Sequence, residues 1–186
     1  KDKSIDVSTI LLGDRNAIIL AARCSAYGKW YKTTVTCPAC GEKTKRAINL
    51  HGAKVYNGDN TEEYNLEKNA SGTYNVVLPY SKLVVECRLM TGKDEVSMIK
   101  ELKDKKKKET GLILKQLSRS IVSVNEYSEP KVINYIIENM VAPDSRYLRE
   151  AIAAFTPTVR IVDDFECSSC GHEQELEVPL NADFFW

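Results

Sequence analysis

The chain has 186 residues, of which 26 are Lys or Arg and 26 are Asp or Glu, so its formal net charge at neutral pH is zero. Its 43% of hydrophobic residues and 28% of charged residues are ordinary for a globular protein, and its length allows one good core or two small ones. The balanced charge excludes an overall field that attracts nucleic acid, and we expect no membrane span because a run of about 18 apolar residues is missing.

The first predicted element is a helix from Asp14 to Tyr27. Asp14 is a suitable N-terminal cap, and Gly28 follows as a natural stop. The helix has apolar residues that predict one buried face, namely Ala17, Ile18, Ala21, Ala22 and Cys24. Cys24, and Cys87 farther along the chain, are interpreted as small apolar residues rather than as metal ligands.

A C-x-x-C-G turn follows this helix. It reads Cys37-Pro38-Ala39-Cys40-Gly41, and residues 31–36 before it are rich in β-branched residues, which favour a strand. The residue after the second cysteine of such a turn often needs a positive φ, which glycine adopts at no steric cost. The pattern predicts a β-hairpin that extends to about Leu50 and presents two thiols to one ion.

The middle of the chain is predicted to contain an exposed insertion, a strand and several helices. Residues 52–72 are polar and rich in Asn, Gly and Glu, whereas residues 81–90 are typical of a strand. Residues 91–94 have the form of a capping box and open the first helix. Further helices are expected over 112–121, 132–140 and 143–155. The lysine run 105–108 is flanked by acidic residues, so it is interpreted as a solvated helix end.

The C-x-x-C-G turn recurs near the end of the chain as Cys167-Ser168-Ser169-Cys170-Gly171, between two further strand-like runs. Four thiolates from two such turns are typical ligands of a structural zinc ion. We therefore expect one structural Zn²⁺ per chain, held by Cys37, Cys40, Cys167 and Cys170. His172 is a second-choice ligand, and the lone His51 is interpreted as a surface or supporting residue.

Disulfides, redox dithiols and unrelated surface turns are the alternatives for the two cysteine pairs. A redox C-x-x-C normally opens a helix in a βαβ unit, whereas both pairs here lie between strands. Six cysteines with two metal-like pairs also argue for a reducing compartment.

The predicted fold class is α+β: a four-cysteine zinc ribbon formed by N- and C-terminal β-hairpins, with an inserted mainly helical region. Residues 1–92 and 157–186 form the β-rich domain that contains the ribbon, and residues 93–156 form the inserted helical domain. Cys40 and Cys167 are 127 positions apart, so one ion would join the beginning of the chain to its end.

Two other groups of residues have simpler interpretations. Asp163, Asp164 and Glu166 lack a nucleophile or histidine partner, so they are interpreted as exposed strand positions rather than as acid–base catalysts. The aromatic end of the chain, Phe184, Phe185 and Trp186, either folds back onto the protein or docks on a neighbouring subunit.

Several short segments occur in a definite order along the chain. They are Leu11–Asn16, Tyr27–Tyr31, the two C-x-x-C-G turns, Leu89–Glu95 and Val178–Trp186. Together they resemble the baseplate hub and hub-assembly proteins of T4-like contractile-tailed bacteriophages, from about residue 8 to residue 186. The resemblance implies a non-enzymatic structural or assembly component of the tail baseplate. It also implies binding to other tail and baseplate proteins in a multi-subunit assembly, within virions that form in the host bacterial cytoplasm.

Two other function classes follow from the cysteine pattern alone. A zinc-ribbon adaptor for nucleic acid would carry interleaved basic and aromatic residues on its strands. Lys43 and Lys45 fit this in the first hairpin, but Glu173 and Glu175 make the second acidic, which disfavours nucleic acid as a partner. A zinc enzyme needs an open coordination position, which four cysteines do not leave, so no catalytic residue is predicted.

Overall fold

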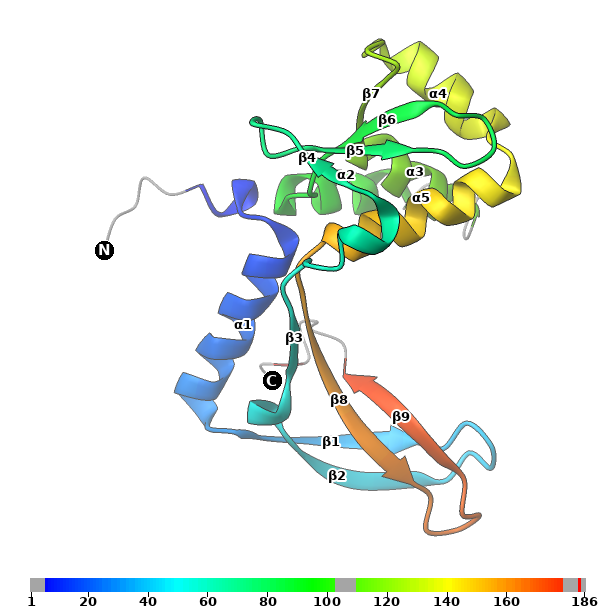
Figure 1. The fold of residues 1–186 in the computed structure, drawn as a ribbon. Coiled ribbons are helices and arrows are strands. Elements are labelled where there is room, and N and C mark those ends of the chain that lie inside the picture. The colour runs from blue at the N-terminus through cyan, green and yellow to red at the C-terminus, as the bar shows by residue number, and fades with distance from the viewer. Residues whose placement is uncertain (1–5, 103–109, 179–183, 185–186) are drawn as a thin grey trace. The chain divides into compact units, whose positions relative to one another are not determined.

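The computed structural model describes residues 6–102, 110–178 and 184. The chain is α+β and divides into two compact units (Figure 1). Unit 1 comprises Lys1–Leu12 and Asn57–Pro157, and unit 2 comprises Gly13–Tyr56 and Thr158–Trp186. The lysine run 105–108, Phe185 and Trp186 lie outside the described residues. Of the helices that are described, each is too short or too polar to cross a lipid bilayer.

Unit 1 is built on an antiparallel sheet with the strand order β4-β5-β6-β7. Its strands are β4 (Glu67–Lys68), β5 (Tyr74–Val77), β6 (Val84–Cys87) and β7 (Ile121–Val124). Its helices are α2 (Gly92–Leu102), α3 (Thr110–Ser120), α4 (Pro130–Asn139) and α5 (Ala142–Phe155), with the short helical turns η1 (Val7–Thr9) and η3 (Glu62–Tyr64). The helices predicted from the sequence over these ranges are therefore confirmed.

The sheet of unit 1 has one apolar and one polar face, because side chains alternate along each strand. Val76 and Val85 lie opposite each other on the apolar face, whereas Asn75 and Glu86 are opposite each other on the polar face. The apolar face packs against α3, α4 and α5. The buried core consists of Tyr74, Val76, Leu78, Val85, Cys87, Leu117, Ile121, Val124, Ile133, Ile137, Leu148, Ala151 and Phe155.

Strand β7 explains why residues 57–92 lie in the same unit as the helices. The sequence placed a domain boundary at residue 92, whereas the structure divides the chain at Asn57. Glu86 of β6 is opposite Ser123 of β7, so a strand that follows α2 and α3 completes the sheet begun before them. Strand β7 begins at Ile121, where the helix predicted over 112–121 ends, and its partner β6 lies far earlier in the sequence. The sequence near β7 therefore did not indicate that it belongs to this sheet.

Residues 52–72 are mostly exposed, as expected, but they are not an insertion that stands apart from the fold. Strand β3 (Lys54–Tyr56) pairs with a strand near the C-terminus, and Tyr64 and Leu66 pack against the core of unit 1. The Tyr147 hydroxyl donates to the Tyr64 carbonyl at 3.2 Å, and the two rings are 5.4 Å apart. The polar composition of the segment concealed these few apolar anchors.

Helix α1 (Leu12–Tyr27) confirms the first predicted helix and its end before Gly28. It begins before Asp14, which lies in its first turn and is not its N-terminal cap, and it packs through a different face. Ile19, Leu20 and Cys24 contact the core of unit 2, whereas Ile18 on the expected face is 56% exposed. Apolar residues occur on several sides of this helix, so their spacing did not decide which side is covered.

Unit 2 contains α1, a two-stranded hairpin and a three-stranded sheet. Strands β1 (Trp30–Thr36) and β2 (Lys43–Asn49) form the hairpin, and the sheet has the order β3-β8-β9, with β8 (Thr158–Glu166) and β9 (Glu173–Val178). The turn η2 (Leu50–Gly52) follows β2. One core of this unit consists of Ile48, Leu50, Ile161, Val178 and Phe184.

The described aromatic residue of the C-terminal tail folds back onto its own unit. The Phe184 side chain is only 1% exposed, and its ring centroid lies 5.1 Å from that of Tyr31. Arg23 Nε donates to the Phe184 carbonyl at 2.9 Å. For Phe184, the structure therefore selects the internal of the two placements that the sequence left open.

The predicted capping box at the start of α2 is present and is extended by an arginine. The N–H and the hydroxyl of Thr91 both donate to Asp94 Oδ2 at 2.8 Å. Arg88 adds two hydrogen bonds to the same carboxylate, at 2.9 and 2.8 Å. Arg88 in particular holds the pKa of Asp94 well below its ordinary value.

Asp144, near the start of α5, is a buried carboxylate that holds the loop between β5 and β6. Its two oxygens accept the backbone N–H groups of Tyr80 and Ser81 at 2.8 and 3.0 Å. Burial disfavours the charged form, but these donors outweigh it and lower the pKa of Asp144. The first turn of a helix also favours a negative charge.

We expect Asp144→Asn to lower the free energy of unfolding at neutral pH by about 1–3 kcal/mol, because one buried donor loses its charged acceptor. The folded-state pKa is depressed, so this contribution is present above the unfolded pKa of about 3.9 and is lost as pH falls through the folded value. Urea unfolding measured from neutral to strongly acid pH should therefore show the two proteins converging in acid.

The matched control is Asp59→Asn, which changes an exposed carboxylate of the same unit. Its stability should equal that of the wild type at neutral pH. Equal losses in both variants, or a loss at Asp144 that does not change with pH, would contradict the assigned role.

Candidate metal centre

The two C-x-x-C-G turns of unit 2 bring four thiols together. The Sγ atoms of Cys37, Cys40, Cys167 and Cys170 all lie within 4.8 Å of one another. Cys37 and Cys167 are buried, whereas Cys40 and Cys170 are exposed. The cluster could hold a metal ion with two ligands on the protein side and two at the surface. Among the described residues, no other group of three or more His, Cys, Asp or Glu side chains converges in this way.

The spacing of the sulfurs fits a tetrahedral ion. Across the two hairpins, the Sγ atoms of Cys37 and Cys170 are 3.8 Å apart, and those of Cys40 and Cys167 are 3.6 Å apart. Zinc–sulfur bonds of about 2.3 Å in a tetrahedron place two sulfurs about 3.8 Å apart. All four cysteines are free thiols, so the disulfide alternative is not adopted.

The two turns have the same backbone geometry. In the first, Cys37 N–H donates to the Glu42 carbonyl at 2.8 Å and Gly41 N–H to the Cys37 carbonyl at 2.9 Å. In the second, Cys167 and Gly171 make the equivalent bonds, both at 2.9 Å. The φ angles of Gly41 and Gly171 are 76° and 69°, a region that other residues enter only with strain. The near-repeat in sequence is therefore a near-repeat in structure.

Backbone donors and neighbouring thiols shift the ionisation of the cluster in opposite directions. The N–H groups of Ser169 and Cys170 stabilise the Cys167 thiolate and lower its pKa to about 7. At Cys40, the Glu42 N–H lowers the pKa, but the hydrogen bonds with the other thiols and burial outweigh it and raise the pKa to about 12. The Cys167 thiolate is therefore easier to form than the Cys40 thiolate, and a bound cation would favour the ionised form of both.

Between the β1–β2 hairpin and the β8–β9 hairpin, a small core and an ion pair lie close to the cluster. Phe165 is buried beside the buried cysteines, with Val35 and Leu176 packed against them. Arg46 of β2 bonds Asp163 of β8 through Nη2 at 2.7 Å and Nε at 3.1 Å. The same Nη2 also donates to the Asp164 carbonyl at 2.8 Å. These contacts join the hairpins independently of a metal.

The remaining candidates from the sequence lie apart from the cluster. His172 Nε2 is within 3.2 Å of Gln174 Oε1 and does not belong to the convergent group. Cys87 is fully buried, and burial raises its pKa to about 12, as expected for a core residue. Asp163, interpreted from the sequence as exposed, is half-buried and paired with Arg46. Asp163 lies two residues before the buried Phe165 on the same strand, so both side chains point to the same, inner face. This spacing could have predicted the partial burial of Asp163 from the sequence.

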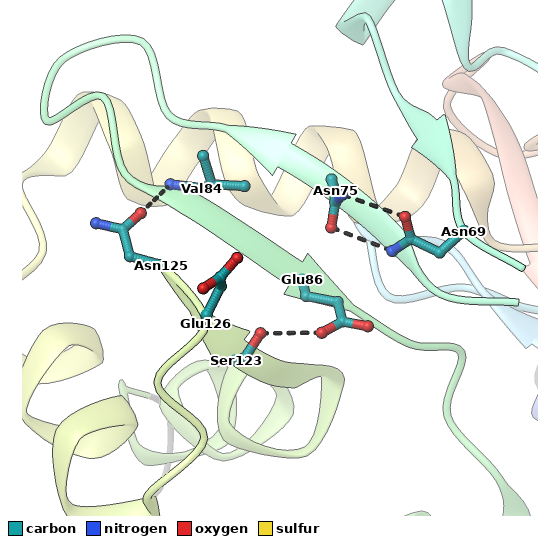
Figure 2. A pocket seen from close by; sticks show the side chains of 7 residues that line it. All are labelled: Asn69, Asn75, Val84, Glu86, Ser123, Asn125 and Glu126. Carbon is teal, nitrogen blue, oxygen red and sulfur yellow. Dashed lines mark hydrogen bonds between the residues drawn. The ribbon is translucent and has the colours of Figure 1, made fainter. Parts of the chain in front are cut away.

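A second group of polar side chains lines a shallow hollow of about 510 Å³ on the polar face of the unit 1 sheet (Figure 2). The lining consists of Asn69, Asn75, Val84, Glu86, Ser123, Asn125 and Glu126. Glu86 accepts the hydroxyls of Thr73 at 2.6 Å and Ser123 at 2.9 Å, and the amides of Asn69 and Asn75 bond each other at 3.2 Å. These bonds connect neighbouring strands, so we assign them to stabilising the sheet.

Comparison with known proteins gives a family. The model of the family described as "T4 bacteriophage base plate protein" matches residues 2–186, which is nearly the whole chain. No curated protein and no solved structure matches it.

We expect Arg46→Ala to lower the free energy of unfolding by about 1–2 kcal/mol, because it removes a partly buried ion pair between β2 and β8. Lys45→Ala is the matched control, since Lys45 is exposed on the other side of the same strand. Chemical unfolding of both variants with equal metal content provides the measurement. The same loss in both variants would show that the inner ion pair adds no stability.

Proposed function

The chain belongs to the T4 bacteriophage base plate protein family, and from this premise we propose that it acts by binding other tail proteins, with one structural zinc ion holding unit 2 together. The family resemblance expected from the sequence is confirmed over residues 2–186. The chain is thus a structural component of a phage tail baseplate. The zinc ion and the mode of protein binding are our proposals.

Zinc is the metal that the donor set fits best. Four cysteine sulfurs at near-tetrahedral spacing match a closed structural zinc site, and such a site leaves no open position for a substrate. The β1–β2 hairpin forms a sheet of only two strands, which is marginally stable in water by itself, and the core beside the cysteines is small. In zinc-finger peptides a comparable site contributes about 10–16 kcal/mol of apparent binding free energy, so a fraction of that would hold the hairpins together.

Exposed apolar side chains support a binding role. In unit 2, Ile18 on α1 is 56% exposed, and Tyr27 and Trp30 at the junction with β1 are 58% and 51% exposed. Large apolar and aromatic side chains of this kind anchor protein interfaces. The sequence left open that the aromatic end of the chain, Phe184 to Trp186, docks on a neighbouring subunit. Since Phe184 lies in the core of unit 2, we transfer the proposal to the exposed surface around Ile18 of α1.

We expect one zinc ion per chain in protein purified under reducing conditions without added metal. Mass-spectrometric metal analysis measures the stoichiometry, and Cys167→Ser should lose most of the zinc because a closed site loses a ligand. Cys24→Ser is the control, since this cysteine lies outside the cluster. A folded, reduced wild type with no zinc would contradict the proposal.

Hydrogen exchange in the same Cys167→Ser variant tests whether the ion joins the two hairpins. Protection should fall in residues 30–49 as well as in residues 158–178, although only the second segment carries the substitution. Unchanged protection in the first hairpin would mean that the two turns do not share an ion.

We expect the tagged protein to co-purify with tail proteins from phage-infected cells, and Ile18→Asp to reduce this recovery by about tenfold without changing the zinc content. Ile99→Asp is the matched control, because Ile99 is also an exposed helical isoleucine, on α2 of unit 1. Crosslinking and mass spectrometry identify the neighbours. A wild-type protein that recovers no tail component overturns the proposed role, whereas equal recovery with Ile18→Asp overturns only the proposed surface.

A further inference from the structure

The ribbon of unit 2 has two outer faces in addition to its inner core. Alternate residues of β1, β2, β8 and β9 point inward, where Val35, Phe165 and Leu176 pack around the buried cysteines. The other residues of the β1–β2 hairpin and of the β8–β9 hairpin point outward and are mostly exposed. Side chains on these two outer faces therefore contribute little to the fold of the ribbon.

The outer face of the β1–β2 hairpin is basic. Lys32, Lys43 and Lys45 are exposed on it, with Lys43 opposite Thr36 and Lys45 opposite Thr34. Within the described part of the chain, none of these three lysines forms an ion pair. A hollow of about 380 Å³ follows Lys32, Thr34 and Lys45 along this face. We call it the basic face.

The outer face of the β8–β9 hairpin is acidic. Asp164 lies directly opposite Glu175, and Glu166 lies directly opposite Glu173. Like charges in such cross-strand positions destabilise a sheet. At one end of this face, Lys54 bonds Glu175 at 2.7 Å and Arg160 bonds Glu177 at 2.9 Å, so the unneutralised charge is concentrated at the other end. Asp164, Glu166 and Glu173 have no cationic partner among the described residues. We call it the acidic face.

The charges on the two faces have matching positions. Lys43 and Lys45 are three and five residues after Cys40, and Glu173 and Glu175 are three and five residues after Cys170. Since the two turns have the same hydrogen bonds and glycine conformations, the two pairs of charges lie at equivalent places relative to the cysteine cluster. The near-repeat therefore presents opposite charges at the same spacing on its two outer faces.

We propose that the basic face of one copy binds the acidic face of a second copy, so that the protein self-associates head to tail. A second copy fits because its opposite face supplies complementary charges at the same spacing. The chain as a whole has a formal net charge of zero, so no overall repulsion opposes the approach of two copies. The inference goes beyond the proposed binding to tail proteins, and it rests on the two hairpins being held together as one ribbon.

A contact of this kind joins two different surfaces. In a pair of copies, one copy therefore keeps its acidic face free and the other copy keeps its basic face free. Such heterologous contacts extend to rings or filaments rather than stopping at a symmetric dimer. The charges are exposed, so each ion pair contributes about 1 kcal/mol or less and is screened by salt. We therefore expect a weak association that grows with protein concentration and is lost at high ionic strength.

The experiment is sedimentation velocity over a range of protein concentrations at about 0.02 M and about 0.5 M NaCl. The wild type should associate at low salt only. Lys43→Glu/Lys45→Glu reverses the basic face and Glu166→Lys/Glu173→Lys reverses the acidic face, and each variant alone should associate at least about tenfold more weakly. An equimolar mixture of the two variants should associate again, because one native basic face and one native acidic face remain between them.

Lys100→Glu/Lys131→Glu is the control, since it makes the same change of charge at exposed positions of unit 1 and should leave the association intact. A zinc-loaded wild type that stays monomeric at low salt overturns the inference and leaves the metal site standing. Association that persists in both single-face variants, or variants that fail to associate when mixed, also overturns it. Zinc content is measured in every sample, so a loss of metal is recognised as a failure of the metal site instead.

Discussion

Four cysteine thiols meet in unit 2, although they come from turns that lie 127 positions apart in the sequence. In the sequence, the segment Asn57–Pro157 of unit 1 lies between the two hairpins that carry these turns. The two hairpins share two small buried clusters. Phe165 packs beside the buried cysteines, and Ile48 packs with Ile161 and Val178 in the core that also holds Phe184. The entropy cost of closing a loop grows only slowly with its length, so a cross-link here tolerates an insertion of domain size. The four thiols converge at this point, and the metal ion that we propose for them would act as such a cross-link.

Inner and outer positions of the two hairpins differ in what limits their residue types. Inside, the identities are limited by contact: Arg46 reaches Asp163, and Phe165 fills the space beside the buried cysteines. Outside, the same two hairpins carry lysines in one case and carboxylates in the other. Opposed carboxylates such as Glu166 and Glu173 weaken the hairpin that holds them, so the fold of a single chain does not explain their presence. The proposed contact with a second copy would explain it, and membership of a family of baseplate components agrees with a role in an assembly.

Unit 1 has its own sheet, its own helices and its own buried core. Hydrogen bonds between residues far apart in the sequence connect its elements. Asp144 accepts the N–H groups of Tyr80 and Ser81, and Glu86 accepts the hydroxyl of Ser123. These groups are satisfied by partners within the unit. We therefore place the metal chemistry in unit 2 and regard unit 1 as a separately stabilised body within the same chain.

Local chemistry was readable from the sequence by itself. The glycine after each C-x-x-C pair, the Thr91–Asp94 cap and the end of α1 before Gly28 each depend on residues within a few positions of one another. The pairing of the two cysteine turns was also predictable, because thiol pairs carry a distance requirement that few other residues share. Periodicity, by contrast, indicates that a face is apolar without naming what covers it. Only the tertiary structure decided that Ile19 and Leu20 of α1 are covered, that β7 completes the sheet begun by β5 and β6, and that Phe184 fills the core of unit 2. Each of these contacts joins segments far apart in the chain, and its free energy depends on surfaces that exist only once both segments are folded.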